Sequence, residues 1–245
     1  MWTDLSIILP CYNEGNIIRQ NIKKVIDYIE TELPKISYEI IVVNDGSTDL
    51  SKRLLRRIDR WIPNNSRANI EVINYSPNRG KGYAIRKGIA KASGHYILFM
   101  DSDLSTSLDE IKHFWKNRQK ADIIIGNRKL SESKIYNKSF KRKIVSFACN
   151  IITKTIVPIK YKDTQCGFKF FNRKAAKDIA RRQTIPRFAF DVEYLYIAKL
   201  RDYSVLELPV EWNDRRDSKV KLSKSSIEFF KDLFKIRANS IRYRR

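Results

Sequence analysis

Short apolar runs alternate with longer stretches in which apolar residues recur every three or four positions along the first 130 residues. The runs end at turn residues and predict strands at residues 5–9, 39–43, 70–73, 96–100 and 122–126. The first strand is expected to stop at Pro10, and the periodic stretches between the strands predict helices. Strands that alternate with helices across short connections form a mostly parallel sheet with helices on both faces, and such sheets bind ligands beyond the carboxyl ends of their strands.

The second half of the chain is less regular. A helical stripe is predicted over residues 138–157, a short strand near 163–171, a helix starting near 187–195, and a strand at 204–212. An amphipathic helix is predicted from Ser223 to the end, in a segment that is strongly basic. From Lys219 to Arg245 there are nine Lys or Arg and two Asp or Glu, a net charge of +7.

The composition is that of a globular protein with a large positive charge. Of the 245 residues 42% are hydrophobic, and the formal net charge is +22, which calls for an anionic partner. No helix-turn-helix, RNP or zinc-finger pattern is present, so we do not expect a nucleic-acid-binding protein. Three cysteines without C-x-x-C spacing predict free thiols in a reducing compartment. No apolar run exceeds five residues, so no transmembrane helix is predicted.

Two carboxylates, Asp101 and Asp103, follow the most apolar of the predicted strands. Residues two apart in extended backbone point to the same side, so both side chains can converge on one point. Paired carboxylates suit Mg²⁺ or Mn²⁺ held against a phosphorylated substrate. The alternative is that the pair only caps the helix that follows, because Asp is a favoured N-cap residue.

Other polar loops follow the neighbouring strands. Asp45 could accept two hydrogen bonds from a ribose or a base, or could simply belong to a turn with Gly46. Residues 78–82 place two glycines and two cations, one of them Lys81, beside a predicted helix N-terminus, which suits phosphate. Their spacing matches neither a P-loop nor a dinucleotide-binding fingerprint. Arg128 follows the fifth strand and points to the same rim.

Together these loops resemble family 2 glycosyltransferases with a GT-A fold, a mostly parallel, Rossmann-like sheet with helices on both faces. The resemblance covers the motifs Pro10-Cys11-Tyr12-Asn13-Glu14, Asn44-Asp45-Gly46-Ser47-Thr48-Asp49, Asn78-Arg79-Gly80-Lys81-Gly82 and Asp101-Ser102-Asp103. Two later motifs look like dolichyl-phosphate glucosyltransferases, close relatives of dolichyl-phosphate mannose synthases: Asp163-Thr164-Gln165-Cys166-Gly167-Phe168-Lys169 and Phe190-Asp191-Val192-Glu193.

The resemblance implies a role for each candidate site residue. Asp101 and Asp103 would hold the metal, with Ser105 as a further ligand. The nucleotide would be bound by Pro10, Tyr12, Glu14, Asp45, Lys81 and Ser102. The acceptor phosphate would be held by Arg128, Arg142 and Lys169. Asp101 and Asp103 would act in catalysis through the metal, and Arg128 through the acceptor phosphate. Asp191 would be a further catalytic carboxylate that faces the site. The alternative for Asp191 is a residue at the start of a helix that faces water.

The implied reaction is metal-dependent, inverting transfer of glucose from UDP-glucose to a polyprenyl or dolichyl phosphate. Transfer of mannose from GDP-mannose, or transfer to a saccharide acceptor, remains open at this point. The catalytic domain is expected over residues 1–222, with a nucleotide-binding half of about 1–130 and an acceptor-binding half of about 131–222, followed by a basic amphipathic helix at 223–245. Residues 138–157 and 223–245 are expected to face a membrane, giving a peripheral protein on its cytoplasmic side.

Overall fold

A computed structural model of the 245-residue chain describes residues 3–60, 62, 66–137, 149–214 and 222–245. Its main sheet has seven strands in the order β3-β2-β1-β4-β7-β5-β8. The strands are β1 (Leu5–Cys11), β2 (Tyr38–Asp45), β3 (Asn69–Tyr75), β4 (Tyr96–Met100), β5 (Ile123–Asn127), β7 (Phe168–Asn172) and β8 (Val205–Pro209). β7 runs antiparallel to both of its neighbours, and the other pairings are parallel. The mostly parallel α/β sheet predicted from the sequence is confirmed.

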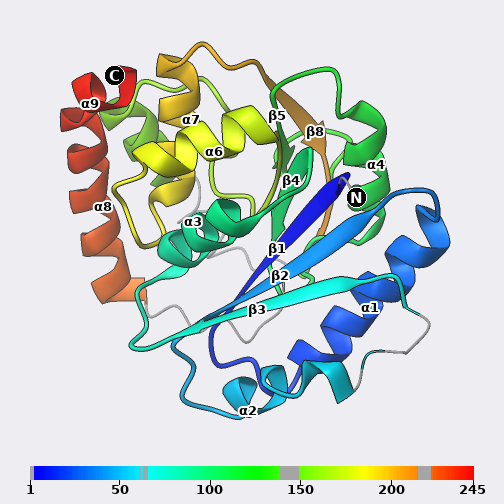
Figure 1. The fold of residues 1–245 in the computed structure, drawn as a ribbon. Helices are drawn as coiled ribbons and strands as arrows, with labels where there is room; N and C mark the ends of the chain where they lie inside the picture. Colours follow the sequence, from blue (N-terminus) through cyan, green and yellow to red (C-terminus); the bar gives the residue numbers. More distant parts are fainter. Residues whose placement is uncertain (1–2, 61, 63–65, 138–148, 215–221) are drawn as a thin grey trace.

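Helices cover both faces of this sheet because its central strands are apolar on both sides (Figure 1). Ile40 and Val42 of β2 pack in one core with α1 (Ile18–Glu32) and α4 (Asp109–Asn117), whereas Ile41 and Val43 pack in a second core on the opposite face. Further helices are α2 (Ser51–Leu55), the 3₁₀ turn η1 (Ile58–Arg60), α3 (Lys81–Lys91), α6 (Arg173–Arg182), α7 (Phe190–Leu200), α8 (Leu222–Ala238) and α9 (Ser240–Arg244). The second core contains residues of α3, α6, α7, α8 and α9.

Three predicted boundaries need correction. β1 continues through Pro10 to Cys11, since it still pairs with β2 after its ladder with β4 has ended at Ile8. The strand predicted at 204–212 is two strands, β8 in the main sheet and β9 (Glu211–Asn213), which pairs with β6 (Lys134–Tyr136) in a small second sheet. The single final helix divides at Asn239 into α8 and α9.

The helix predicted over residues 138–157 lies only partly within the described residues. Residues 149–156 are helical, and residues 138–148 lie outside the part of the chain that is described.

α8 and α9 pack on α7 through Leu233, Ile236 and Tyr243, so they share the second core with the sheet domain. The proposed division at residue 222 stays a prediction. Among the described helices, none has the length and apolar character needed to cross a bilayer.

Candidate active site

The centre of the candidate site is the turn that follows β4. Asp101 forms an ion pair with Lys81, the first residue of α3, with 2.5 Å between Asp101 Oδ1 and Lys81 Nζ. The turn closes at Leu104, which takes a positive φ of 54° and donates its N–H to the Asp101 carbonyl. The Asp101 side chain is 34% exposed, so one side of its carboxylate is open to solvent.

Asp103 lies beside Asp101 and is restrained by Ser105. The Ser105 N–H donates to Asp103 Oδ1 at 2.9 Å. Burial and the negative charge of Asp101 raise the pKa of Asp103, and the bonds from Ser105 and the charge of Lys81 oppose this rise. Ser105 itself is nearly buried. Its observed contact is with Asp103, so its predicted part as a metal ligand stays a prediction.

The two carboxylates fit a divalent cation that completes its coordination with substrate oxygens. They are hard oxygen donors, and their mutual repulsion, visible in the raised pKa of Asp103, is relieved by positive charge. Among the described residues no cluster of three or more His, Cys, Asp or Glu side chains could hold a metal on its own. Magnesium commonly binds in this way, through one or two carboxylates and the phosphates of a substrate.

Ser102, between the two aspartates, connects this turn to the turn after β1. Its hydroxyl lies 2.5 Å from Glu14 Oε2 and 2.7 Å from the Pro10 carbonyl oxygen, and its carbonyl accepts from Asn21 Nδ2 at 2.8 Å. The side chain of Tyr12 is 41% exposed on the same loop. Four of the residues predicted to bind nucleotide, those of the β1 loop and Ser102, are therefore brought together.

Asp45, the fifth, is occupied by the protein itself. It is buried, and its carboxylate accepts from Asn78 Nδ2 at 2.8 Å, Arg79 N at 2.7 Å and Gly80 N at 2.8 Å. These bonds attach the loop of residues 78–80, which precedes Lys81, to the end of β2. Gly46 permits this approach, because it has a φ of 67° and a Cβ there would lie 2.4 Å from Asn78 N. A direct contact between Asp45 and a ribose stays a prediction.

Arg128 is held by Asp163, the first residue of the motif at 163–169, for which the sequence predicted no individual role. The Arg128 backbone N and Nε donate to Asp163 Oδ2 at 3.0 and 2.7 Å, and Nη2 donates to Oδ1 at 3.0 Å. Burial would raise the pKa of Asp163, but the Arg128 charge holds it well below its usual value. The guanidinium also lies over the Trp212 ring, 5.2 Å from its centroid. Arg128 is thus fixed at the end of β5, and its role at an acceptor phosphate stays a prediction.

Lys169 and Asp191 form a buried ion pair with each other. Lys169 has no exposed surface and also donates to the Cys166 carbonyl at 2.7 Å. The alternative, that Asp191 faces water from the start of a helix, is wrong because Asp191 is buried on α7 and paired with Lys169 of β7. Its predicted role as a catalytic carboxylate stays a prediction. The role of Lys169 at an acceptor phosphate stays a prediction, although its ammonium is already occupied. Arg142 lies outside the described residues.

Residues 6–180 match Glycosyl transferase family 2. The chain belongs to this family. It is 36% identical to a Trichomonas vaginalis protein named dolichyl-phosphate beta-glucosyltransferase ALG5D, over 95% of this chain and 72% of that protein. It is 31% identical to the human dolichyl-phosphate beta-glucosyltransferase, over 95% of this chain and 74% of that protein. The resemblance seen in the sequence is confirmed.

Solved structures with the same fold include a mycobacterial enzyme. Glucosyl-3-phosphoglycerate synthase from Mycobacterium tuberculosis, crystallised with Mn²⁺, UDP and glucosyl-3-phosphoglycerate, aligns with a TM-score of 0.66 and 14% identity, over 97% of this chain and 79% of that one. The S. aureus TarS structure (residues 1–349) with UDP aligns with a TM-score of 0.57 and 18% identity, over 98% of this chain and 65% of that one. At these identities the likeness shows the GT-A fold alone.

Proposed function

We propose that this glycosyltransferase transfers glucose from UDP-glucose to dolichyl phosphate or a related polyprenyl phosphate, with inversion at the sugar. The observation that carries the proposal is the set of relatives, 31–36% identical over 95% of this chain, that bear the name dolichyl-phosphate beta-glucosyltransferase. The mycobacterial structure with the same fold was crystallised with Mn²⁺ and UDP-glucose, which supports the choice of donor and of Mg²⁺ or Mn²⁺.

Asp101 and Asp103 would hold the cation, and Ser105 would hold Asp103 in place. A divalent cation on the diphosphate neutralises the charge of the leaving group and so lowers the barrier to transfer. Lys81 balances the charge of Asp101 and stands at the N-terminus of α3, where helix geometry favours anions. Pro10, Tyr12, Glu14 and Ser102 would line the place of the nucleotide.

The chemistry of the acceptor agrees with the burial of Asp191. A phosphate monoester has a second pKa of about 6 and is largely ionised at neutral pH, so it attacks without a general base. A saccharide hydroxyl would need a base, and Asp191, the candidate for that task, is buried and paired with Lys169. Orientation of the acceptor would fall to Arg128, which is rigidly held at the rim.

We also propose that the protein works as a peripheral protein on the cytoplasmic face of a membrane, docked through α8, α9 and the helix at residues 149–156. Ile227 and Phe234, seven residues apart on α8, and Ile241 on α9 are 61%, 63% and 69% exposed. Exposed cations accompany them: Lys231, Lys235, Arg237 and Arg242. Exposed apolar and basic side chains together suit the interface of an anionic bilayer.

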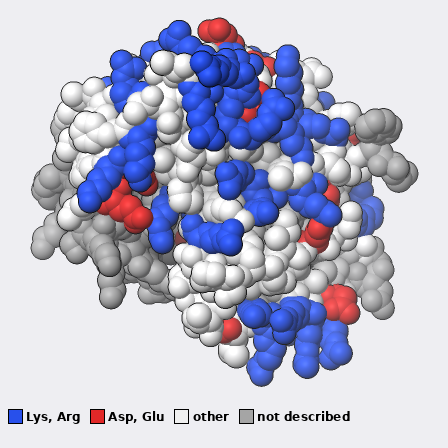
Figure 2. Space-filling view, turned by 60° about the vertical axis from the view of Figure 1, so that its left-hand side comes forward, with Lys and Arg blue, Asp and Glu red and all other residues white. Residues whose placement is uncertain are grey.

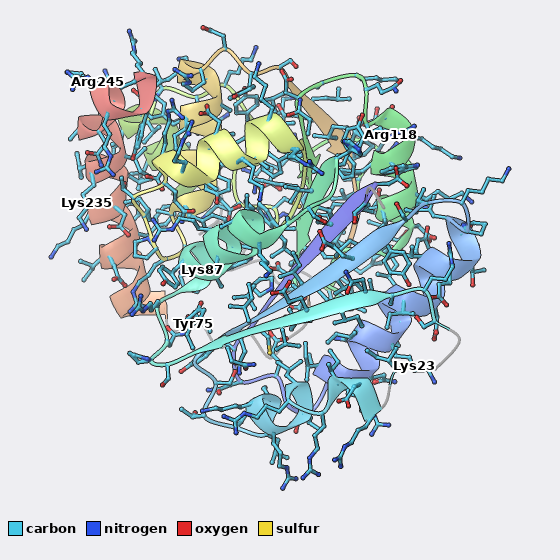
Figure 3. The ribbon with its side chains drawn as sticks, viewed as in Figure 1. Lys23, Tyr75, Lys87, Arg118, Lys235 and Arg245 are labelled. Carbon is cyan, nitrogen blue, oxygen red and sulfur yellow. The ribbon has the colours of Figure 1, made fainter. Side chains whose placement is uncertain are left out.

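The figures support a basic docking face. Figure 2, in which the side of α8 and α9 comes forward, shows many more Lys and Arg than Asp and Glu. In Figure 3, Lys235 lies on α8 at the edge of the molecule. The three cysteines are free, which agrees with a reducing compartment.

The test of the reaction is transfer of radiolabel into the organic phase. UDP-glucose and GDP-mannose are each offered with dolichyl phosphate and with a saccharide acceptor, with Mn²⁺ or with EDTA. We expect label from UDP-glucose in the lipid, lost with EDTA and in Asp103→Asn, whose thermal unfolding should stay near that of the wild type. Label from GDP-mannose alone, or only in the saccharide, would refute the proposal.

The test of docking is sedimentation with vesicles of anionic and of neutral lipid. Binding to anionic vesicles should weaken as salt rises and weaken further in Phe234→Ser. Tyr136→Ser, which removes an exposed aromatic side chain from β6, serves as the matched control. Equal binding to both kinds of vesicle in all variants would contradict the proposed face.

A further inference from the structure

The carboxylate of Asp101 rests directly on the backbone of Gly167, a residue without a role in the site so far. A Cβ at position 167 would lie 2.0 Å from Asp101 Oδ2 and 2.6 Å from Asp101 Cγ. The Asp101 N–H also donates to the Gly167 carbonyl at 3.2 Å. Any side chain at this position would therefore move the Asp101 carboxylate away from its present place.

The backbone next to Gly167 is held in place by Lys169. The Lys169 ammonium donates to the carbonyl of Cys166, the residue before Gly167, at 2.7 Å. Asp191, at the first turn of α7, holds the ammonium in this position through the buried ion pair. A buried lysine is costly unless it is paired and hydrogen-bonded, and here both requirements are met by these two partners.

The two oxygens of the Asp101 carboxylate have different neighbours. Oδ1 lies 2.5 Å from Lys81 Nζ, whereas Oδ2 lies against Gly167. The carboxylate of Asp101 is thus held from one side by Lys81 and from the other by a backbone whose position depends on Lys169.

We propose that Gly167 and the Lys169–Asp191 pair are positioning residues, which set the Asp101 carboxylate for the divalent cation. This inference rests on the proposed metal-dependent reaction, and it gives Lys169 a task other than direct contact with an acceptor phosphate. Residues that orient a metal ligand through such contacts change metal affinity without touching the metal.

The test measures Mn²⁺ affinity by the EPR signal of the free ion, in the presence of UDP, and does not require transfer. Gly167→Ala should weaken Mn²⁺ binding about 10- to 100-fold, the range typical of residues that orient a metal ligand. Gly88→Ala is the matched control, because its methyl group crowds Ile8 at 2.5 Å, in the core and away from the turn. That variant should lose thermal stability and keep its Mn²⁺ affinity.

Lys169 is tested by replacing both members of the pair, Lys169→Met with Asp191→Leu. Removing one charge alone would leave its partner buried and unpaired, whereas removing both often preserves folding. The double variant should also bind Mn²⁺ at least about 10-fold more weakly. Its KM for the lipid phosphate, measured at saturating Mn²⁺, should stay within about twofold of the wild type, a change worth less than about 0.5 kcal/mol.

The outcomes separate this inference from the proposed reaction. Wild-type Mn²⁺ affinity in Gly167→Ala, or no Mn²⁺ binding by the wild type, would overturn it. A double variant with normal Mn²⁺ affinity and a raised KM for the lipid would overturn it as well, and would place Lys169 at the acceptor. If Mn²⁺ binding responds as expected but dolichyl phosphate receives no glucose, the positioning role stands and the proposed reaction fails.

Discussion

Glu193 is a fully buried carboxylate on α7, and removing its hydrogen bond from Tyr243 tests how the C-terminal helices are held. Its Oε1 accepts from Thr184 N at 2.7 Å, Thr184 Oγ1 at 2.6 Å and Tyr243 OH at 2.6 Å. Its Oε2 accepts from Ile185 N at 2.9 Å. Tyr243 belongs to α9, so a single carboxylate joins α7, the loop before it and the end of the chain.

The perturbation is Tyr243→Phe, which keeps the buried ring and removes the hydroxyl, 3.1 Å from Thr184 Oγ1, together with its hydrogen bond to the charged Glu193. Such a bond contributes about 1.5–3 kcal/mol, so we expect the free energy of unfolding to fall by about 2 kcal/mol. For a chain of this size that lowers the Tm by about 4–8 °C. Tyr136→Phe, at an exposed tyrosine of β6, is the control and should change the Tm by less than about 1 °C.

The effect should depend on pH in a defined direction. Burial raises the pKa of Glu193 above its ordinary value of 4.5, and the bonds from Thr184 and Tyr243 oppose the rise. A carboxyl group with a raised pKa contributes stability that is present below pH 4.5 and is lost as pH rises through its folded value. Tyr243→Phe removes a donor to the ionised form, so its destabilisation should be greater at pH 7 than at pH 4.

Urea unfolding at both pH values, followed by circular dichroism, measures this directly. The reasoning would be refuted if Tyr243→Phe unfolded within about 0.5 kcal/mol of the wild type at pH 7, the change typical of a surface substitution. It would also be refuted if the loss were larger at pH 4, because the charged acceptor would then not be the source of the stability.

Two further changes test the frame of the site. Asp163→Asn should cost about 1.5–3 kcal/mol at pH 7, because it removes the charged acceptor of the half-buried Arg128. The difference from wild type should shrink as pH falls below 3.8 and be lost as pH falls through the depressed pKa of Asp163 in the folded protein. Asp45→Ala removes the acceptor of two backbone N–H groups in the loop of residues 78–80. UDP binding, measured by calorimetry, should weaken at least about 10-fold, and trypsin should cut at Arg79 faster than in the wild type. Unchanged cutting would contradict the assigned role of Asp45.

The strands of the parallel half could be predicted because each is an apolar run that ends at a polar turn. β2 is buried along its whole length, so its sequence carries the signal of a strand covered on both faces. The reversed direction of β7 could not be predicted, because no local pattern in Phe168–Asn172 distinguishes a parallel from an antiparallel neighbour. The break between β8 and β9 at Val210 likewise depends on a second sheet, formed by residues about 75 positions earlier in the chain.

The Asp101 turn could be predicted because its carboxylates follow a buried strand at a spacing that brings them together. The burial of Lys169 was harder to predict, although the neighbouring residues indicated it. Lys169 lies among Phe168, Phe170 and Phe171 in a strand covered on both faces, so it cannot reach water from either side. A lysine in such a strand requires a buried acceptor, and Asp191 supplies one from a helix that lies 22 residues further along.

α7 explains why the site and the C-terminal helices are parts of one structure. Its first turn carries two buried carboxylates, Asp191 and Glu193, and negative charge near a helix N-terminus is favoured by the helix dipole. Asp191 is paired with Lys169, which fixes the backbone beneath Asp101. Glu193 is bonded to Tyr243 of α9. Loosening α7 would therefore disturb both the proposed metal-binding turn and the proposed membrane face. A variant that unfolds α9 should be examined for Mn²⁺ affinity as well as for vesicle binding.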